Sequence, residues 1–534
     1  MDTVKSLGVM IDCSRDAVYT VETLKEYISI LAAMGYNSVQ LYTEDTYEIA
    51  EEPYFGYLRG RYSKQELQEL DTYAKNLGVE LIPCIQTLAH LGGITRWAEY
   101  KSCTDFGDIL FVGEDRTYKL IENMFATCAE CFSSRRINIG MDEAHMVGLG
   151  QFLDKHGYQK RYDILLRHLY RVNEIATKYG FKPMMWSDMF FRLAMKGEYY
   201  CADNSIPKDV IDAVPDNIDL IYWDYYSVEY NRYDAMISAH TQFRSHMVFA
   251  GGAWSWSGFA PVNRFSIQAS KEALRVCAKH GVNDIFITCW KDDGAECSLF
   301  STLPSLFCTA EFARGNFNMK DIADKFKNFI GIDFAAFMAL DSVNICNVDE
   351  AVRNPSKYML YSDPFLGMFD GLIVEKDAEK FADAKLLLLQ TEKNKKFGYI
   401  FKVLIALCDV LEIKYALGVK TRRAYKSGDK NELSVLIGEY RELERRLEKF
   451  YYYFSLQWEK ECKPNGFEKH DIRLGGLIKR VKHCRRMLTD FCNGRRNEIS
   501  CLNEEILPIE KDLQKGDFLN FNRWHSTAMI KPLS

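Results

Sequence analysis

The chain has 534 residues, of which 47% are hydrophobic and 27% are charged, the balance of a folded soluble protein. At this length we expect two or three domains, each with its own core. The net charge of −6 gives no electrostatic case for nucleic acid binding. No apolar run is long enough to span a membrane, and the first residues, MDTVKSLGVMIDC, lack the pattern of a signal peptide.

The cysteines argue against disulfides and against a metal site. There are 16, scattered mostly singly, and the close pair Cys128 and Cys131 has no second pair to complete a zinc site. We therefore expect free thiols in a reducing cytoplasm, with no bound metal and no cofactor.

The first 315 residues repeat one pattern, in which an amphipathic helix ends in glycine and an apolar strand follows. Ser63 and Glu66 form a capping-box pattern at the start of one such helix, and Gly78 ends it. Glycine after a helix supplies the left-handed turn that reverses the chain toward a sheet. The predicted strands lie at 7–12, 38–43, 79–85, 136–141, 183–186, 218–223, 247–250 and 284–290.

Eight strands alternating with helices predict an α/β fold, a (β/α)8 TIM barrel, over residues 1–315. A doubly wound open sheet is the alternative, but no glycine-rich dinucleotide loop favours it. From 316 to 534 the strand pattern fades, and helices are predicted at 376–392, 395–417 and 431–454. We expect this part to be a mainly α-helical domain. It could also serve as the interface of a homodimer.

In such a barrel the active site lies at the carboxyl ends of the strands. The residues found there are polar or aromatic: Asp12 and Arg15, Glu44 and Asp45, His90, Asp142 and Glu143, Trp186 and Asp188, Trp223 to Tyr226, Trp254 and Trp256, and finally Trp290, Asp292, Asp293 and Glu296. Aromatic faces with interspersed carboxylates and an arginine suit a sugar. A phosphate would instead favour glycine-rich or basic loops.

Two adjacent acids, Asp142 and Glu143, end the fourth predicted strand. Burying carboxylates is costly unless they are paired, hydrogen-bonded or protonated. They could cap a following helix. Arg15 could instead be a surface ion-pair partner, and His90 could be a histidine packed for structural reasons. The occurrence of all four at strand ends favours chemistry.

These residues carry a resemblance. The run Asn138 to Ala144, Asn-Ile-Gly-Met-Asp-Glu-Ala, resembles the Gly-x-Asp-Glu signature of family 20 glycoside hydrolases, the exo-acting β-N-acetylhexosaminidases. Asp12-x-x-Arg15, Thr43-Glu44-Asp45, His90 and Trp290 match in order, so the resemblance covers about residues 1–315. The helical part is similar to the extension of two-domain bacterial members whose barrel comes first.

The resemblance implies a retaining, substrate-assisted reaction, in which the 2-acetamido oxygen of the sugar attacks its own anomeric carbon and forms an oxazolinium ion. Glu143 would be the general acid and then the base. Asp142 would accept a hydrogen bond from the acetamido N–H. Adjacent strand residues face opposite ways, so the backbone must leave strand geometry for both acids to act.

The remaining roles are implied in the same way. Arg15 would bind hydroxyls of the terminal sugar, and His90 with Glu44 would form a relay behind the acids. Tyr225 would orient the acetamido carbonyl, although the Tyr-Leu-Asp segment usual in the family is absent. Asp292 or Glu296 would bind the outer hydroxyls. The predicted pocket walls are Trp186, Trp223, Trp254 and Trp290.

The expected substrate is an oligosaccharide or glycoconjugate with a terminal β-linked N-acetylhexosamine, either GlcNAc or GalNAc. Two alternatives stay open. One is a non-catalytic carbohydrate-binding barrel protein. The other is a glycosidase of another barrel family, although the chitinase-type Asp-x-x-Asp-x-Asp-x-Glu run is absent near residue 143.

Overall fold

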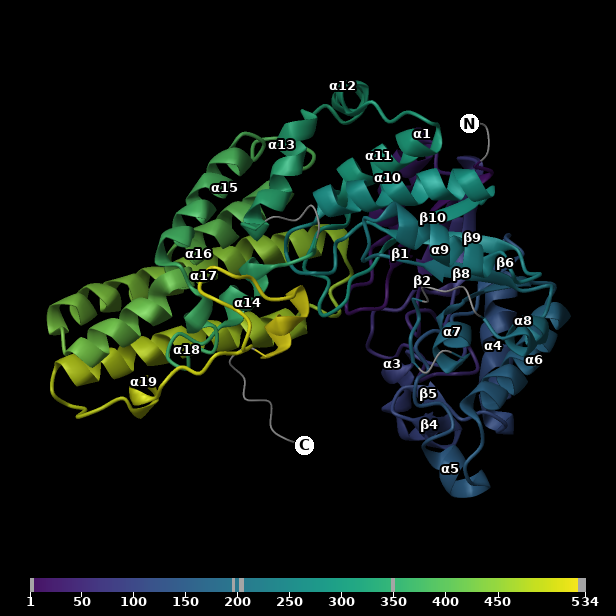
Figure 1. Cartoon of the computed structure of the whole chain (residues 1–534), viewed down its shortest axis with the longest axis horizontal. Helices are drawn as coiled ribbons and strands as arrows, with labels where there is room; N and C mark the ends of the chain where they lie inside the picture. The colour runs from purple at the N-terminus through teal and green to yellow at the C-terminus, as the bar shows by residue number, and fades with distance from the viewer. Residues whose placement is uncertain (1–3, 195–196, 201–205, 347–350, 527–534) are drawn as a thin grey trace.

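The computed structural model describes residues 4–194, 197–200, 206–346 and 351–526 of the chain. It consists of an α/β barrel, drawn in purple to teal, and a set of long helices, drawn in green to yellow, on one side of it (Figure 1). Among the described residues, no helix is long and apolar enough to cross a membrane.

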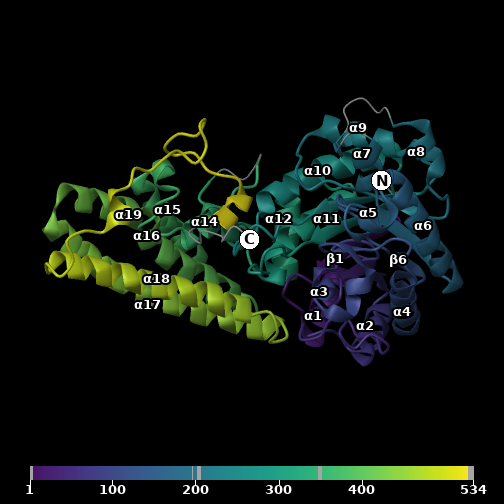
Figure 2. The same cartoon turned by 90° about the horizontal axis from the view of Figure 1, so that it is seen from below.

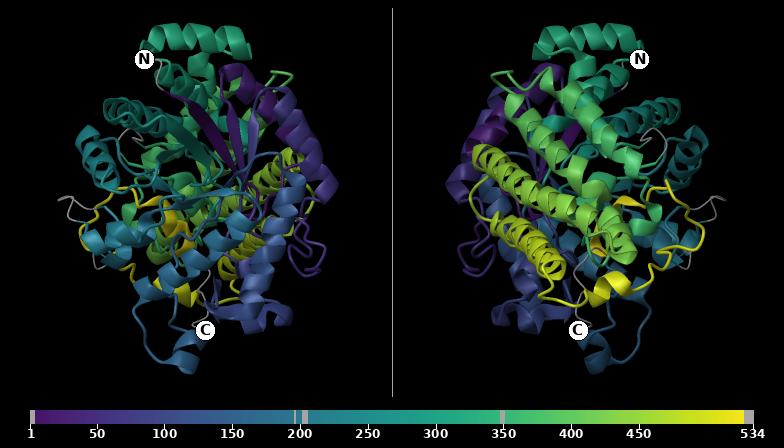
Figure 3. Two further views of the ribbon diagram at one scale, coloured as in Figure 1. Left: turned by 90° about the vertical axis from the view of Figure 1, so that its right-hand side faces the viewer. Right: turned by 90° about the vertical axis from the view of Figure 1, so that its left-hand side faces the viewer.

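Eight parallel strands form a closed barrel, in the order β1-β10-β9-β8-β7-β6-β3-β2, which confirms the predicted fold. The strands are β1 (Ser6–Asp12), β2 (Ser38–Tyr42), β3 (Glu80–Cys84), β6 (Arg136–Asn138), β7 (Lys182–Trp186), β8 (Asp219–Trp223), β9 (Met247–Gly252) and β10 (Asp284–Cys289). Helices surround the strands, as the left view of Figure 3 shows. The strands are almost wholly buried, which explains their continuous apolar runs.

Local sequence signals set the helix ends of the barrel. Helix α1 (Val21–Met34) ends at Gly35, whose φ of 95° only glycine adopts without strain. Helix α2 (Lys64–Asn76) begins with the predicted capping box, in which Ser63 and Glu66 each bond the other's backbone N–H. Other helices of the barrel are α4 (Asp115–Cys131), α6 (Arg161–Lys178), α9 (Tyr230–His240), α10 (Asn263–His280) and α11 (Leu303–Ala313).

Two features of the barrel were not predicted. The fourth strand of the barrel, β6, ends at Asn138 rather than at residue 141, because Gly140 and Met141 have φ values of 72° and 69°, outside strand geometry. The loop after β3 carries a small antiparallel hairpin, formed by β4 (Thr104–Phe106) and β5 (Ile109–Leu110).

The helical part is built on long antiparallel helices that lie side by side (Figure 2). The three predicted helices are present as α15 (Glu379–Leu389), α16 (Gly398–Ser427) and α17 (Lys430–Glu461), and α18 (Glu468–Cys492) adds a fourth. Helix α16 runs ten residues beyond its predicted end, residue 417, because Tyr425 and earlier residues stay buried until Gly428, with a φ of 70°, stops it. Shorter helices α12 (Met319–Ile330), α13 (Phe334–Met338), α14 (Pro355–Tyr361) and α19 (Ser500–Asn503) complete this part.

Candidate active site

A pocket opens at the carboxyl ends of the barrel strands. Its lining residues are Arg15, His90, Asp142, Glu143, Trp186, Trp223, Tyr225, Tyr226, Trp256, Trp290 and Asp292. All eleven were named at predicted strand ends, and nine of them were given a role in the site, although they are distant in sequence. The barrel brings them together because all its strands are parallel and therefore end on the same face.

The backbone after β6 turns both acids toward the pocket. Met141 and Glu143 have φ values of 69° and 51°, so Asp142 lies between two left-handed residues. In a regular strand the two neighbouring side chains would point to opposite faces. The departure from strand geometry that the two roles require is therefore present.

Asp142 is a buried carboxylate held by two side chains. Gln86 Nε2 donates to its Oδ1 at 2.8 Å, and His90 Nε2 lies 3.3 Å from its Oδ2. Burial raises the pKa of Asp142, but the His90 charge and the hydrogen bonds from His90 and Gln86 outweigh burial and hold this pKa below its usual value. Burial lowers the pKa of His90, yet the Asp142 charge raises it to about 9. The two residues therefore form an ion pair at neutral pH.

This ion pair predicts a pH dependence of stability. Because the pKa of His90 is raised to about 9 in the folded protein, its contribution is complete below the ordinary histidine pKa of about 6.5 and is lost as pH rises through 9. We expect the melting temperature of wild type to exceed that of His90→Gln by several degrees at pH 6, and the gap to shrink by pH 9.5. Calorimetry across this range measures the gap, and a constant gap would contradict the ion pair.

Glu143 lies next to the ion pair but is more accessible. Its side chain is 43% exposed, and its Oε2 lies 3.7 Å from His90 Nε2. Its backbone N–H donates to Asp188 Oδ2 at 3.2 Å, and Arg192 Nε donates to the same oxygen at 3.3 Å. Burial raises the pKa of Asp188, and the charges of Asp142 and Glu143 raise it further. Asp188 thus holds the backbone of Glu143 without itself lining the pocket.

Arg15 joins the first and last strands of the barrel. Its Nη1 lies 3.0 Å from Asp12 Oδ2 and 2.9 Å from Asp292 Oδ1, and its Nε lies 3.2 Å from Glu44 Oε1. Its guanidinium also lies 5.0 Å from the centre of the Trp290 ring. Three carboxylates and a ring fix this side chain, so its remaining N–H groups are presented in one orientation.

Glu44 lies behind the pocket, next to Arg15, and is not part of its lining. Tyr42 donates to its Oε1 at 3.0 Å. Burial raises the pKa of Glu44 to about 7, against the opposing charges of Arg15 and His90. Its position beside both residues is consistent with the predicted relay behind the acids.

Aromatic rings form the walls of the pocket. Trp186 and Trp290 lie 6.1 Å apart, and Trp223 stacks on Tyr225 at 5.2 Å with an angle of 22° between the rings. The indole N–H of Trp186 is buried and has no hydrogen-bond partner within the described part of the chain. An unpaired donor at a pocket wall is available to a ligand oxygen.

The prediction for Trp254 was wrong in detail. Trp254 is 1% exposed, and its indole N–H donates to the Tyr225 carbonyl at 2.7 Å. Trp256 stacks on it at 4.1 Å and faces the pocket in its place. Trp254 therefore supports the wall from behind, and its neighbour two residues on is the wall itself.

The prediction that Glu296 binds a sugar hydroxyl was also wrong. Glu296 is 2% exposed and lies outside the pocket lining. Its Oε1 lies 2.8 Å from Nζ of Lys357, a buried lysine of α14 in the helical part. A buried carboxylate needs such a partner. Asp292 does line the pocket and remains the candidate for the outer hydroxyls.

Sequence reasoning did not assign roles to four residues that shape the site: Gln86, Asp188, Tyr226 and Trp256. The last three stand at strand ends and carried that signal. Gln86 also directly follows a predicted strand, 79–85, but a neutral amide there has no pattern that marks it for a role. Its importance comes from holding both Asp142 and the backbone N–H of Met141.

Backbone strain is concentrated on this face of the barrel. Among the described residues, nine that are not glycine have a positive φ, and seven of them follow the barrel strands: Asp16, Glu44, His90, Met141, Glu143, Asp293 and Ala295. Such conformations persist only where the surrounding structure enforces them, and they cluster at functional sites. The strain independently marks the same face as the pocket.

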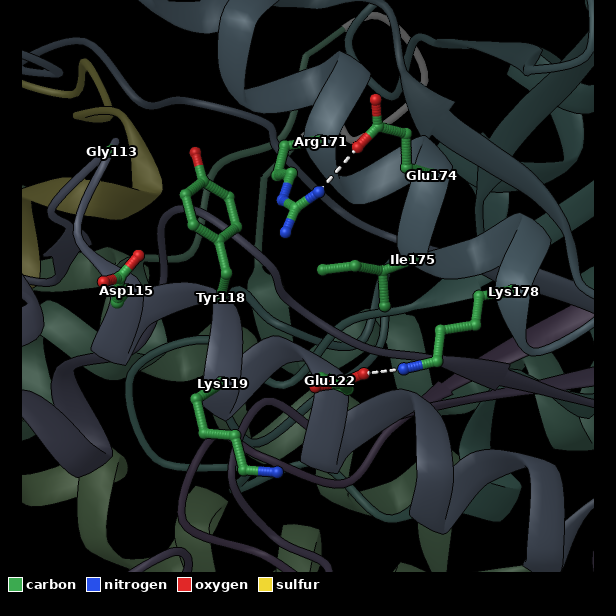
Figure 4. Close-up of a pocket in the computed structure, with 9 residues that line it drawn as sticks. All are labelled: Gly113, Asp115, Tyr118, Lys119, Glu122, Arg171, Glu174, Ile175 and Lys178. Atoms are coloured by element: carbon green, nitrogen blue, oxygen red, sulfur yellow. Dashed lines mark hydrogen bonds and ion pairs between the residues drawn. The ribbon is translucent and has the colours of Figure 1, made fainter.

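A second hollow lies on the outer surface of the barrel, between α4 and α6 (Figure 4). Four of its charged residues form ion pairs, Arg171 with Glu174 and Lys178 with Glu122. None of its lining residues stands at the end of a barrel strand. Within the described ranges, no three His, Cys, Asp or Glu side chains are grouped so that they could hold a metal ion.

Comparison with protein families gives two matches. Residues 7–204 match the catalytic domain of glycosyl hydrolase family 20, and residues 333–519 match the glycoside hydrolase 20C C-terminal domain. Among curated proteins, hexosaminidase D of Bos taurus is 25% identical over 219 residues, which are 38% of this chain and 58% of that protein. The Homo sapiens hexosaminidase D is 25% identical over 221 residues, 38% of this chain and 42% of that protein. The match thus spans about half the length of these relatives.

Solved structures that the comparison found to be similar include a family 20 exo β-N-acetylglucosaminidase from Vibrio harveyi in complex with N-acetylglucosamine. It is 14% identical with a TM-score of 0.48, over 63% of this chain and 58% of that one. The β-N-acetylhexosaminidase from Bacteroides fragilis is 19% identical with a TM-score of 0.48, over 61% and 70%. The two family matches together take in the barrel strands as far as β7 and most of the helical part. The chain belongs to glycoside hydrolase family 20.

Proposed function

We propose that this protein is an exo-acting β-N-acetylhexosaminidase that releases terminal β-linked GlcNAc or GalNAc from oligosaccharides or glycoconjugates. The observation that carries the proposal is the pairing of two neighbouring acids in different environments. Asp142 is buried and held as an anion by His90 and Gln86, whereas Glu143 is 43% exposed at the same pocket. Two acids with different surroundings are suited to different tasks.

In the proposed reaction Glu143 handles the proton. It protonates the glycosidic oxygen as the bond to the anomeric carbon breaks, and later takes a proton from the water that attacks. The nucleophile is the acetamido oxygen of the substrate, which is held close to the anomeric carbon and gains from proximity. Asp142 accepts a hydrogen bond from the acetamido N–H and stabilises the positive charge that develops on the oxazolinium ring.

The rest of the pocket supports the recognition of a sugar. Arg15 and Asp292 meet at 2.9 Å and can exchange part of this contact for sugar hydroxyls. Trp186, Trp223 and Trp290 provide apolar faces for the pyranose ring and the acetamido methyl group. The Tyr225 hydroxyl is the proposed donor to the acetamido carbonyl, which turns the oxygen toward the anomeric carbon.

Substrate assistance makes a prediction about inhibition. A thiazoline fused to the sugar has the shape of the oxazolinium intermediate but is not hydrolysed. We expect it to bind at least ~10²-fold more tightly than N-acetylglucosamine, as analogues of high-energy states do. Competitive inhibition of 4-nitrophenyl β-GlcNAc hydrolysis measures the difference. Equal affinity would argue for a nucleophile supplied by the protein.

A further inference from the structure

The loop after β10 runs from the pocket to the surface that contacts the helical part. Trp290 and Asp292 line the pocket, and the next three residues are Asp293, Gly294 and Ala295, with φ values of 65°, 140° and 55°. Three consecutive left-handed residues, two of them not glycine, are strained. Such a segment keeps its shape only if its surroundings impose it.

Two side chains of helix α18 form hydrogen bonds with the backbone of this strained segment. Arg473 Nη1 donates to the Asp293 carbonyl at 2.6 Å, and His470 Nε2 lies 2.6 Å from the Gly294 carbonyl. A Cβ at Gly294 would lie 2.6 Å from Arg473 Nη1, so the close approach of this side chain to the loop requires glycine. These contacts come from the helical part alone and not from a barrel strand.

Other elements of the helical part hold the same loop. Trp524 Nε1 donates to Asp293 Oδ2 at 3.1 Å, and α17 contributes Gln457, whose Nε2 donates to the Glu296 carbonyl at 3.2 Å. Lys357 of α14 forms the buried pair with Glu296. Side chains from widely separated places in the sequence thus converge on three of the four residues that directly follow Asp292, namely Asp293, Gly294 and Glu296.

The first-strand loop, which carries Arg15, is held by the same region. The backbone N–H of Lys463 donates to the Val18 carbonyl at 2.7 Å, and Lys469 forms an ion pair with Asp16. A Cβ at Gly466 would lie 2.2 Å from the Asp16 carbonyl oxygen. The turn between α17 and α18 therefore packs directly on this loop.

We propose that the helical part sets the position of Asp292 relative to Arg15, and thereby the fit of the terminal sugar's hydroxyls, with Arg473 as the main positioning residue; this rests on the proposed function. Arg473 does not line the pocket and acts through the loop after β10, where its Nη1 donates to the Asp293 carbonyl and lies 3.7 Å from Glu296 Oε1. When its hydrogen bond is lost, the strained segment relaxes and Asp292 moves with it. The helical part is then a component of sugar recognition.

A double-mutant cycle tests this role, with 4-nitrophenyl β-GlcNAc as substrate. We expect Arg473→Met to raise KM about tenfold, the effect of one lost charge-assisted hydrogen bond, with a much smaller change in kcat. In an Asp292→Asn background the same substitution is expected to change KM less than about twofold, because the group being positioned is already lost. Equal effects in both backgrounds would overturn the proposal.

The control is Arg485→Met on the same helix. Arg485 is 23% exposed, close to the 19% of Arg473, and pairs with Glu444 rather than with the barrel, so we expect unchanged kinetics.

If Arg473→Met fails to fold, Trp524→Phe takes its place in the same cycle. This substitution removes the indole donor to Asp293 but keeps an aromatic ring at the position. A wild type that neither hydrolyses the substrate nor binds N-acetylglucosamine by calorimetry overturns the proposed function as well. An active wild type with additive effects overturns the positioning role alone.

Discussion

Replacement of Glu143 by glutamine is expected to reduce hydrolysis of chitobiose by about 10²–10⁴-fold, the contribution of a positioned general acid and base. The amide has the same shape but cannot give up a proton. The Glu143 carboxylate comes near His90, at 3.7 Å, and its side chain is 43% exposed, so we expect the fold to tolerate the change. Steady-state kinetics with matched melting curves measure both effects.

A substrate with a better leaving group separates the loss of the general acid from other effects of this substitution. A 2,4-dinitrophenyl glycoside departs without protonation, so its first step is expected to lose much less rate in Glu143→Gln than that of chitobiose. The matched control is Glu174→Gln, which lies in the outer hollow of Figure 4 with a side chain 66% exposed. We expect wild-type kinetics from it. Full activity on chitobiose in Glu143→Gln would refute the assignment of the acid.

Replacement of Asp142 by asparagine is expected to lower kcat by about 10²–10³-fold, the range for losing one preorganised electrostatic partner. Asparagine still accepts a hydrogen bond through its oxygen, but it carries no charge to stabilise the oxazolinium ring. It also removes the anion that raises the pKa of His90 to about 9. Because burial lowers that pKa, we expect it to fall to about 6.5 or below.

Two measurements separate these effects. Steady-state kinetics give kcat, and an NMR titration of the histidine rings, assigned with His90→Gln, gives the pKa. The control is Asp115→Asn, an exposed acid at the start of α4. A loss of activity without a change in the His90 titration would mean that the ion pair at 3.3 Å is not the source of the raised pKa.

Much of this architecture was predictable because its signals are local. Gly35 and the Ser63–Glu66 capping box mark helix ends through backbone geometry that depends on neighbouring residues only. Once the strands are placed, their parallel order puts the strand-end residues on one face. Arg15 and Asp292, at opposite ends of the barrel sequence, therefore meet without any direct signal of contact.

The parts that were not predictable depend on packing between distant segments. Trp254 and Trp256 follow the same strand, and no periodicity in a loop shows which ring faces the pocket. Glu296 resembled a pocket acid because its partner, Lys357, belongs to a helix in the other half of the chain. The length of β6 was overestimated because Ile139 and Met141 are apolar and buried yet lie in irregular backbone after the strand.

The left-handed residues around the pocket also lower the free energy of unfolding of this protein. Each such residue costs about 1–3 kcal/mol, and glycine would carry little of that cost. Met141→Gly or Ala295→Gly would relieve strain at single positions whose φ values are 69° and 55°. The same change would free the backbone beside the acids or beside Asp292. Attempts to make the enzyme more robust are therefore better directed away from this rim, since stability recovered there is exchanged for precision in the site.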